Sequence, residues 1–145
     1  MRRIFRILLT IAGSRFKVHG VSMEPNYTNG MVLRVSSLLY RFRSPARGDV
    51  VVFRTSGTSR FELKRIVALG EEEISWTKGG TMEIDGKPYK EQYAKIVDMP
   101  GDEFTKILLT RGQFFLLGDN RLHSRDSRDY GPIVSSEIIG KVLDS

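Results

Sequence analysis

Short segments rich in β-branched and aromatic residues, separated by glycine-containing turns, constrain the fold of this chain most. Such residues favour pleated, half-buried strands, and glycine pairs such as Gly79-Gly80 mark the turns between them. The pattern predicts a mainly β fold of antiparallel sheets coiled into a barrel-like or sandwich architecture. Helix is expected only at the N-terminus and at a turn in 135–139. The expected strand segments are 15–23, 31–40, 48–55, 61–70, 81–89, 112–119 and 138–144.

Composition narrows the chemistry that this fold can carry. The chain has 145 residues and is 40% apolar, which suits one globular unit with its own core. It contains no cysteine and two histidines, which excludes disulfides, thiol nucleophiles and cysteine-rich zinc sites. We therefore expect no metal and no cofactor. Any catalysis must use hydroxyls, amines, carboxylates or guanidinium groups.

The N-terminal segment 1–15 is short, basic and amphipathic, and we expect the catalytic domain to occupy 16–145. Three arginines precede the apolar run 7–13, which is far shorter than the about 20 apolar residues that span a bilayer. A basic amphipathic helix can lie in a membrane interface. A first element packed on the core and a shortened membrane anchor are the other interpretations, and all three are open.

The net charge of +6 is compatible with nucleic acid, an anionic lipid surface or simple solubility. In the loop 118–131 arginines alternate with aspartates, which suits an internally paired loop better than a phosphate-binding one. No nucleic-acid partner is expected. The segment 36–43, "SSLLYRFR", joins apolar and basic residues and is either a contact with an anionic membrane or a strand edge on the core.

Ser22, in "GVSMEPNYTNG", is either a turn residue or a nucleophile. A serine hydroxyl is a weak nucleophile without a positioned base. His19 lies three residues away, which on a strand sends the two side chains to opposite faces. His123 lies in a distant loop and would need an orienting carboxylate, such as Asp119 or Asp126. The histidine pairing is therefore disfavoured, and a lysine becomes the alternative base.

Lys64 lies among apolar neighbours in the expected strand 61–70. An exposed lysine has a pKa near 10.4 and is almost wholly protonated at neutral pH. Burial disfavours the ammonium and can lower the pKa by as much as about 3–5 units. Spacing alone leaves Lys64 open to both interpretations, an exposed charge or a buried general base.

Four motifs in order resemble the bacterial type I signal peptidases, membrane-bound serine proteases with a Ser/Lys dyad. They are "SMEP" (22–25), "RGDVVVF" (47–53), "KRIVALGEE" (64–72) and "GDNRLHSRDSRDYG" (118–131). The last motif is highly specific. The segment 74–93 resembles the β-hairpin insertion of that family, and the resemblance extends from Phe16 to the C-terminus.

The resemblance implies that Ser22 is the nucleophile and Lys64 the general base. It further implies that the hydroxyl of Ser124 orients the lysine amine, and that Asp126 and Arg128 form a supporting ion pair. The implied reaction is cleavage of N-terminal signal peptides from exported preproteins, after small residues in an Ala-X-Ala pattern. The implied location is the cell membrane, with the catalytic domain on the extracytoplasmic face and the anchor short or missing.

Two positions depart from the family pattern. Gly20 stands where some members carry a hydroxyl that contributes to the oxyanion hole, and Asn26 stands where threonine is usual. Val21, Met23 and Leu63 flank the nucleophile and base and are expected to line the substrate pocket. The peptide would bind by strand addition, so that alternate side chains enter shallow pockets.

Other functions remain to be compared with a signal peptidase. One is a dedicated maturation protease for a single exported protein. Another is the Ser/Lys domain of a self-cleaving repressor, which would require a DNA-binding module that 21 residues before Ser22 cannot hold. The third is a non-catalytic β-barrel binding module, which would follow if Lys64 were exposed.

Overall fold

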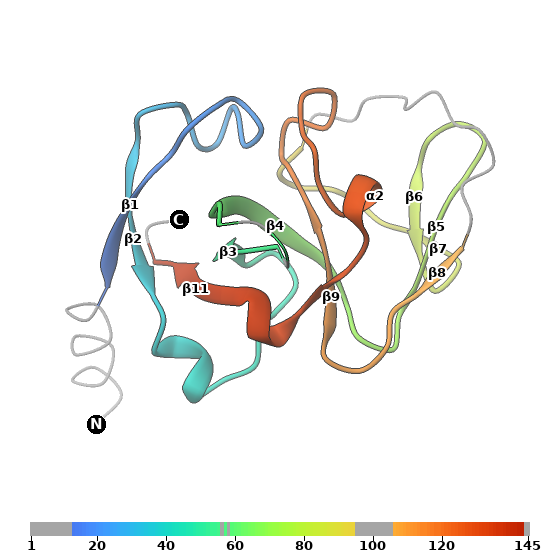
Figure 1. Cartoon of the computed structure of the whole chain (residues 1–145). Helices are drawn as coiled ribbons and strands as arrows, with labels where there is room; N and C mark the ends of the chain where they lie inside the picture. The colour runs from blue at the N-terminus through green and yellow to red at the C-terminus, as the bar shows by residue number, and fades with distance from the viewer. Residues whose placement is uncertain (1–12, 56, 58, 95–105, 144–145) are drawn as a thin grey trace.

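The structure is a computed structural model that describes residues 13–55, 57, 59–94 and 106–143. Within these residues the chain forms two antiparallel sheets that lie side by side (Figure 1). The larger sheet is curled into a half-barrel. Its strand order is β1 (Ser14–Lys17), β2 (Val32–Ser36), β11 (Ile138–Val142), β3 (Val50–Phe53), β4 (Glu62–Leu69), β9 (Gln113–Leu117) and β10 (Ile133–Val134).

The centre of the larger sheet is buried on both faces. On β3, Val50 and Val52 belong to one apolar cluster, whereas Val51 and Phe53 belong to another. Successive side chains of a strand point to opposite faces, so each face of β3 must be covered. This explains why "VVVF" is a continuous apolar run rather than an alternating one.

The smaller sheet contains the expected hairpin insertion. Its strand order is β7 (Lys87–Pro88), β6 (Met82–Ile84), β5 (Glu73–Trp76) and β8 (Ile107–Leu108). A third apolar cluster, which includes Val67, Ile74 and Phe115, joins this sheet to β4 and β9. The chain passes from β4 to β5 at Gly70, where a Cβ would lie 2.8 Å from the Thr110 carbonyl oxygen. The close approach of the two backbones requires glycine there.

Three short helical turns complete the described chain: η1 (Leu39–Arg41), α2 (Ser127–Tyr130) and η2 (Ser135–Glu137). The mainly β fold class and the turn at 135–139 are confirmed. The expected strand 31–40 was too long, because β2 ends at Ser36 and 39–41 form a 3₁₀ turn. The segment 36–43 is therefore not a strand beyond Ser36, although Tyr40 does pack on the core, against the cluster of Val51 and Phe53. The expected N-terminal helix lies outside the described residues.

Candidate active site

Ser22 lies in the loop between β1 and β2. Backbone hydrogen bonds between Val18 and Met31, and between Gly30 and Val18, close the base of this loop. Next to this base, Gly20 adopts a φ of 85°, and its N–H donates to the side-chain oxygen of Asn29 at 3.0 Å. A positive φ favours glycine, so Gly20 has a conformational reason to be there. Ser22 itself is half-buried.

Lys64 reaches Ser22 from the middle of β4. Its Nζ lies 3.1 Å from Ser22 Oγ, although the two residues are 42 positions apart in the chain. Lys64 is 4% exposed, because β3 and β9 pair with β4 on either side and the Lys64 backbone lies opposite Val51. Burial lowers the pKa of the Lys64 amine, while the carboxylates of Glu62 and Asp126 act in the opposite direction. The interpretation of Lys64 as an exposed charge is therefore wrong.

The loop 118–131 packs directly against the nucleophile segment. The backbone N–H of Asn120 donates to the Ser22 carbonyl at 3.0 Å, and its side-chain amide donates to the Val21 carbonyl at 3.1 Å. A Cβ on Gly118 would lie 2.1 Å from Ser124 Oγ and 2.5 Å from the Ser22 carbonyl oxygen. Only glycine fits at position 118. The absence of a side chain there allows loop 118–131 to contact the loop that carries Ser22.

Asp126 organises the second half of this loop. It is fully buried, accepts a hydrogen bond from the Gly118 N–H at 3.0 Å, and pairs with Arg128 Nε at 2.8 Å. Its carboxylate also caps α2, with Asp129 completing the capping box. Arg128 in turn donates to the Arg121 carbonyl at 2.9 Å. The ion pair thus holds both ends of the turn that carries Ser124.

The Ser124 hydroxyl is buried beside Gly118. It has no hydrogen-bond partner within 13–55, 57, 59–94 and 106–143. Among the described residues the hydroxyl therefore makes no hydrogen bond to Lys64, and its donor and both lone pairs are unused.

A second buried ion pair, which the sequence pattern did not reveal, involves Arg65, the residue that follows Lys64 in β4. Arg65 donates to both carboxylate oxygens of Asp119, at 2.8 and 2.7 Å. Its guanidinium carbon Cζ lies 3.8 Å from the ring centroid of Tyr93. The Asn26 side chain donates to Asp119 at 2.8 Å and to the Tyr93 carbonyl at 2.8 Å. Asn26 thereby joins the loop that carries Ser22 to the loop after β9 and to the end of the insertion, and Asp119 in turn connects to β4 through Arg65.

The expectation of an internally paired loop 118–131 holds for part of its charges. Asp126 and Arg128 do pair inside the loop, but Asp119 pairs with Arg65 of β4, and Arg121 pairs with Glu91. The partners lie 54 and 30 positions away. Alternating charges in sequence could not reveal partners that only the fold brings close.

The three expected pocket residues differ in exposure. Val21 is 46% exposed beside Ser22, whereas Met23 and Leu63 are 1% and 6% exposed in the apolar cluster around Val50. Gly20 offers no side chain.

His123 is exposed and has its Nδ1 3.3 Å from the Asn120 side-chain oxygen. In the part of the chain that the structure describes, the basic group hydrogen-bonded to Ser22 is Lys64.

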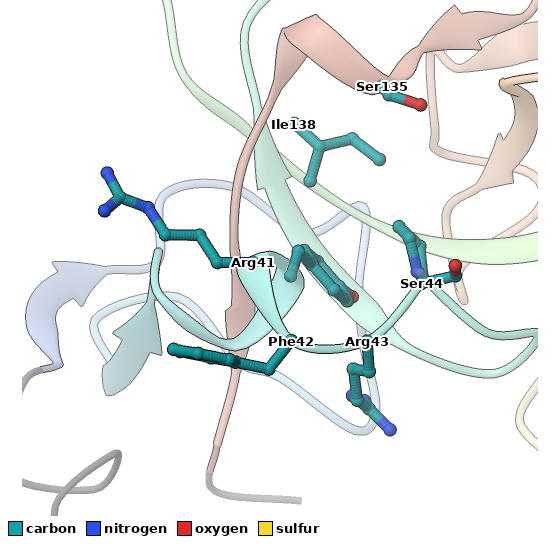
Figure 2. A pocket seen from close by; sticks show the side chains of 8 residues that line it. Arg41, Phe42, Arg43, Ser44, Ser135 and Ile138 are labelled. Carbon is teal, nitrogen blue, oxygen red and sulfur yellow. The ribbon is translucent and has the colours of Figure 1, made fainter.

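Away from the dyad, a cavity of about 500 Å³ lies between η1 and the start of β11, lined in part by Tyr40, Ser135 and Ile138 (Figure 2). The figure shows Arg41 and Phe42 projecting to the same side of η1.

Across the described ranges, no helix has the length and hydrophobicity to cross a membrane. Those same residues contain no cluster of three or more histidine, aspartate or glutamate side chains placed to hold a metal.

Comparison with known proteins identifies relatives of this chain. The family described as signal peptidase, peptidase S26, matches residues 3–143. Signal peptidase I V of Bacillus subtilis strain 168 is 32% identical over 142 residues, which cover 90% of this chain and 83% of that protein. Signal peptidase I of Bacillus caldolyticus is 34% identical over 141 residues, with 89% and 76% covered.

A solved structure shares the fold. The crystal structure of a signal peptidase I from Enterococcus faecalis V583 superimposes with a TM-score of 0.57 at 25% identity. The match covers 68% of this chain and 97% of that one.

Proposed function

This chain belongs to the signal peptidase family, peptidase S26, and from that premise we propose that Ser22 and Lys64 carry out its reaction. The activity is that of a serine peptidase that cleaves signal peptides from preproteins. The observation that supports the dyad is the 3.1 Å hydrogen bond between Lys64 Nζ and Ser22 Oγ. The lowered pKa of the buried Lys64 amine favours the neutral form that a general base needs.

In the proposed acylation step, the neutral Lys64 amine takes the proton of Ser22 as Oγ bonds to the scissile carbonyl carbon. The resulting ammonium then gives that proton to the departing amine as the peptide C–N bond breaks. Deacylation repeats the sequence with water. Lys64 activates the water, which attacks the acyl carbon, and the proton returns to Ser22 Oγ.

The negative charge on the tetrahedral oxygen needs preorganised donors. We assign one of them to the Ser22 backbone N–H, and a single such donor is typically worth about 3–4 kcal/mol. Gly20 supplies no side-chain donor, so the hydroxyl found in some family members has no counterpart at that position.

Ser124 is proposed to orient the lysine amine, and Asp126 with Arg128 to hold the turn that carries Ser124. The support for this assignment is the buried hydroxyl beside Gly118 and the 2.8 Å ion pair in the same loop. A rotation about χ1 is all that a free serine hydroxyl needs to reach a new acceptor or donor.

The proposed substrate is an extended segment with small residues at the first and third positions before the cut. Strand addition would supply backbone hydrogen bonds and place alternate side chains toward the enzyme. Val21 is the exposed wall of this proposed pocket, and Met23 and Leu63 would shape it from beneath, because both are buried.

The proposed site of action is the cell membrane, on the extracytoplasmic face, with an anionic lipid surface as a second partner. The charge of +6 and the segment 36–43 support this proposal. Phe42 is 64% exposed and stands between the exposed Arg41 and Arg43. Aromatic and basic side chains together suit an anionic interface.

The decisive test compares wild type, Ser22→Ala and Lys64→Ala on an Ala-X-Ala peptide or a preprotein in detergent. We expect both variants to lose nearly all activity, by about 10⁴-fold or more, because nucleophile and base act as a unit. Retention of the expected fold is checked by circular dichroism. Equal cleavage by all three proteins would end the dyad proposal.

The family and the relatives do not favour the alternatives considered for this chain, a dedicated maturation protease or a non-catalytic binding module. The condition for the binding module, an exposed Lys64, is not met.

A further inference from the structure

Glu62 lies beside the proposed general base on the same strand. It is the first residue of β4 and stands two positions before Lys64, so both side chains point to the same face of the sheet. Its Oε2 lies 3.6 Å from Lys64 Nζ. The Lys64 side chain is 5% exposed and that of Glu62 30%, so the pair lies at the mouth of the buried site.

The other charged and titratable groups near Lys64 are differently engaged. Asp126 also acts on the amine, but its carboxylate already accepts from Arg128 Nε at 2.8 Å and Nη2 at 2.9 Å. Tyr130 is near both carboxylates, and burial raises its pKa, so it stays a neutral phenol. In the described part of the chain, Glu62 has Lys64 as its sole ion-pair partner. Glu62 is thus the carboxylate whose negative charge acts mainly on the Lys64 amine.

We propose that Glu62 is a positioning residue for the general base: its carboxylate holds the Lys64 amine against Ser22 and stabilises the ammonium formed when the serine proton is transferred. The inference rests on the proposed Ser22–Lys64 dyad. In the acylation step the Oγ–H bond breaks, an N–H bond forms on Nζ, and the new positive charge faces Glu62. The same contact opposes loss of the proton in the resting enzyme.

Two effects with opposite consequences follow for a Glu62→Gln variant. Without the carboxylate the pKa of Lys64 falls further, so the neutral amine is present at lower pH. The ascending limb of kcat/KM against pH therefore moves to lower pH, by about one unit. At the plateau, kcat falls by roughly two- to fivefold, because the ammonium of the transition state loses its partner.

The experiment measures pH profiles of kcat and KM for wild type, Glu62→Gln and Glu73→Gln. Glu73 is a matched control, since it pairs with Lys106 at 2.9 Å in the smaller sheet. We expect the control to superimpose on wild type and KM to stay unchanged in all three. An ascending limb that does not move in Glu62→Gln contradicts the inference. So does a change confined to KM, which would instead indicate contact with the substrate.

A second measurement is independent of turnover. In the Ser22→Ala background, with lysines labelled with ¹³C at Cε, the Lys64 resonance is titrated with and without Glu62→Gln. The inference requires a lower midpoint in the double variant, and coincident midpoints would overturn it. Full activity in Lys64→Ala would instead end the dyad proposal itself, so the two failures are distinguishable.

Discussion

Lys64 shows how the surroundings of a residue change its chemistry. A lysine in "FELKRIV" is compatible with a solvated strand face, and its ordinary pKa would make it useless as a base near neutrality. Here β3 and β9 flank its strand and leave the side chain almost inaccessible. Desolvation lowers the pKa of its amine, and the 3.1 Å hydrogen bond places that amine against the hydroxyl that we propose it deprotonates.

Gly118 is a second residue whose identity is dictated by contact. We expect Gly118→Ala to lower kcat by about 100-fold, because the added Cβ would lie 2.1 Å from Ser124 Oγ and 2.5 Å from the Ser22 carbonyl oxygen. A shift of the Ser22 carbonyl displaces the proposed nucleophile, and a shift of Ser124 Oγ displaces the hydroxyl proposed to orient Lys64. The measurement is steady-state cleavage of an Ala-X-Ala peptide.

The matched control for this substitution is Gly79→Ala. A Cβ there would lie 3.9 Å from Thr77 Oγ1, an ordinary van der Waals distance, in a turn of the smaller sheet. We expect wild-type kinetics from this variant. Wild-type kinetics from Gly118→Ala as well would show that the loops can separate without cost.

At the scale of elements, three segments far apart in sequence are held together around the dyad. The nucleophile loop contributes Asn26, strand β4 contributes Arg65, and the loop after β9 contributes Asp119. Buried ion pairs are costly to break, because one partner is left as an uncompensated charge. The Arg65–Asp119 pair therefore holds the loop after β9 in a fixed position against strand β4.

We expect Asn26→Ala to lower kcat by about tenfold with a smaller change in KM. The substitution removes hydrogen bonds to the Asp119 carboxylate and to the Tyr93 carbonyl, and bonds to charged groups contribute about 1.5–3 kcal/mol. The looser nucleophile loop would then place Ser22 less well against Lys64.

The control for Asn26→Ala is Gln113→Ala. This substitution removes a side-chain amide oxygen that accepts the Thr110 N–H at 2.8 Å. Gln113 is the first residue of β9, at the opposite end of that strand from Asp119. Its kcat should match that of wild type. If Asn26→Ala keeps full activity while its unfolding free energy falls, the contact serves stability and not positioning of the nucleophile.

At the scale of the whole molecule, the half-barrel carries the dyad and the smaller sheet is attached beside it (Figure 1). The apolar cluster around Val67 and Phe115 joins the two sheets into one core. The turn η1 lies at the larger sheet and presents Arg41 and Phe42 on one side (Figure 2). An exposed aromatic residue among arginines is the surface to test for contact with lipid.

We expect the protein to co-sediment with vesicles rich in phosphatidylglycerol at low salt and to be released at high salt. Salt shortens the range of the attraction, to about 10 Å at 0.1 M. The double variant Arg41→Ala/Phe42→Ala should bind more weakly. Leu108→Ala, which removes an equally exposed apolar side chain from the smaller sheet, should bind as wild type does. Absence of sedimentation at low salt would contradict the membrane proposal.

The sequence by itself determined the mainly β fold, because strand residues and glycine turns are local signals. It also determined the family, since the motifs around Ser22, Lys64 and Gly118 are contiguous and specific. It did not determine that β2 ends at Ser36, because the apolar residues of 38–40 look the same in a strand and in a 3₁₀ turn. Element ends are set by packing, which a local pattern does not contain.

Only the tertiary structure decided which side chains meet. Burial of Lys64 depends on strands β3 and β9, and the pairing of Arg65 with Asp119 joins positions 54 residues apart. The part played by Asn26 and the contact of Glu62 with the amine likewise require coordinates. Charge, burial and hydrogen bonding are properties of three-dimensional neighbours, so the sequence could name candidate groups but not the distances that let them react.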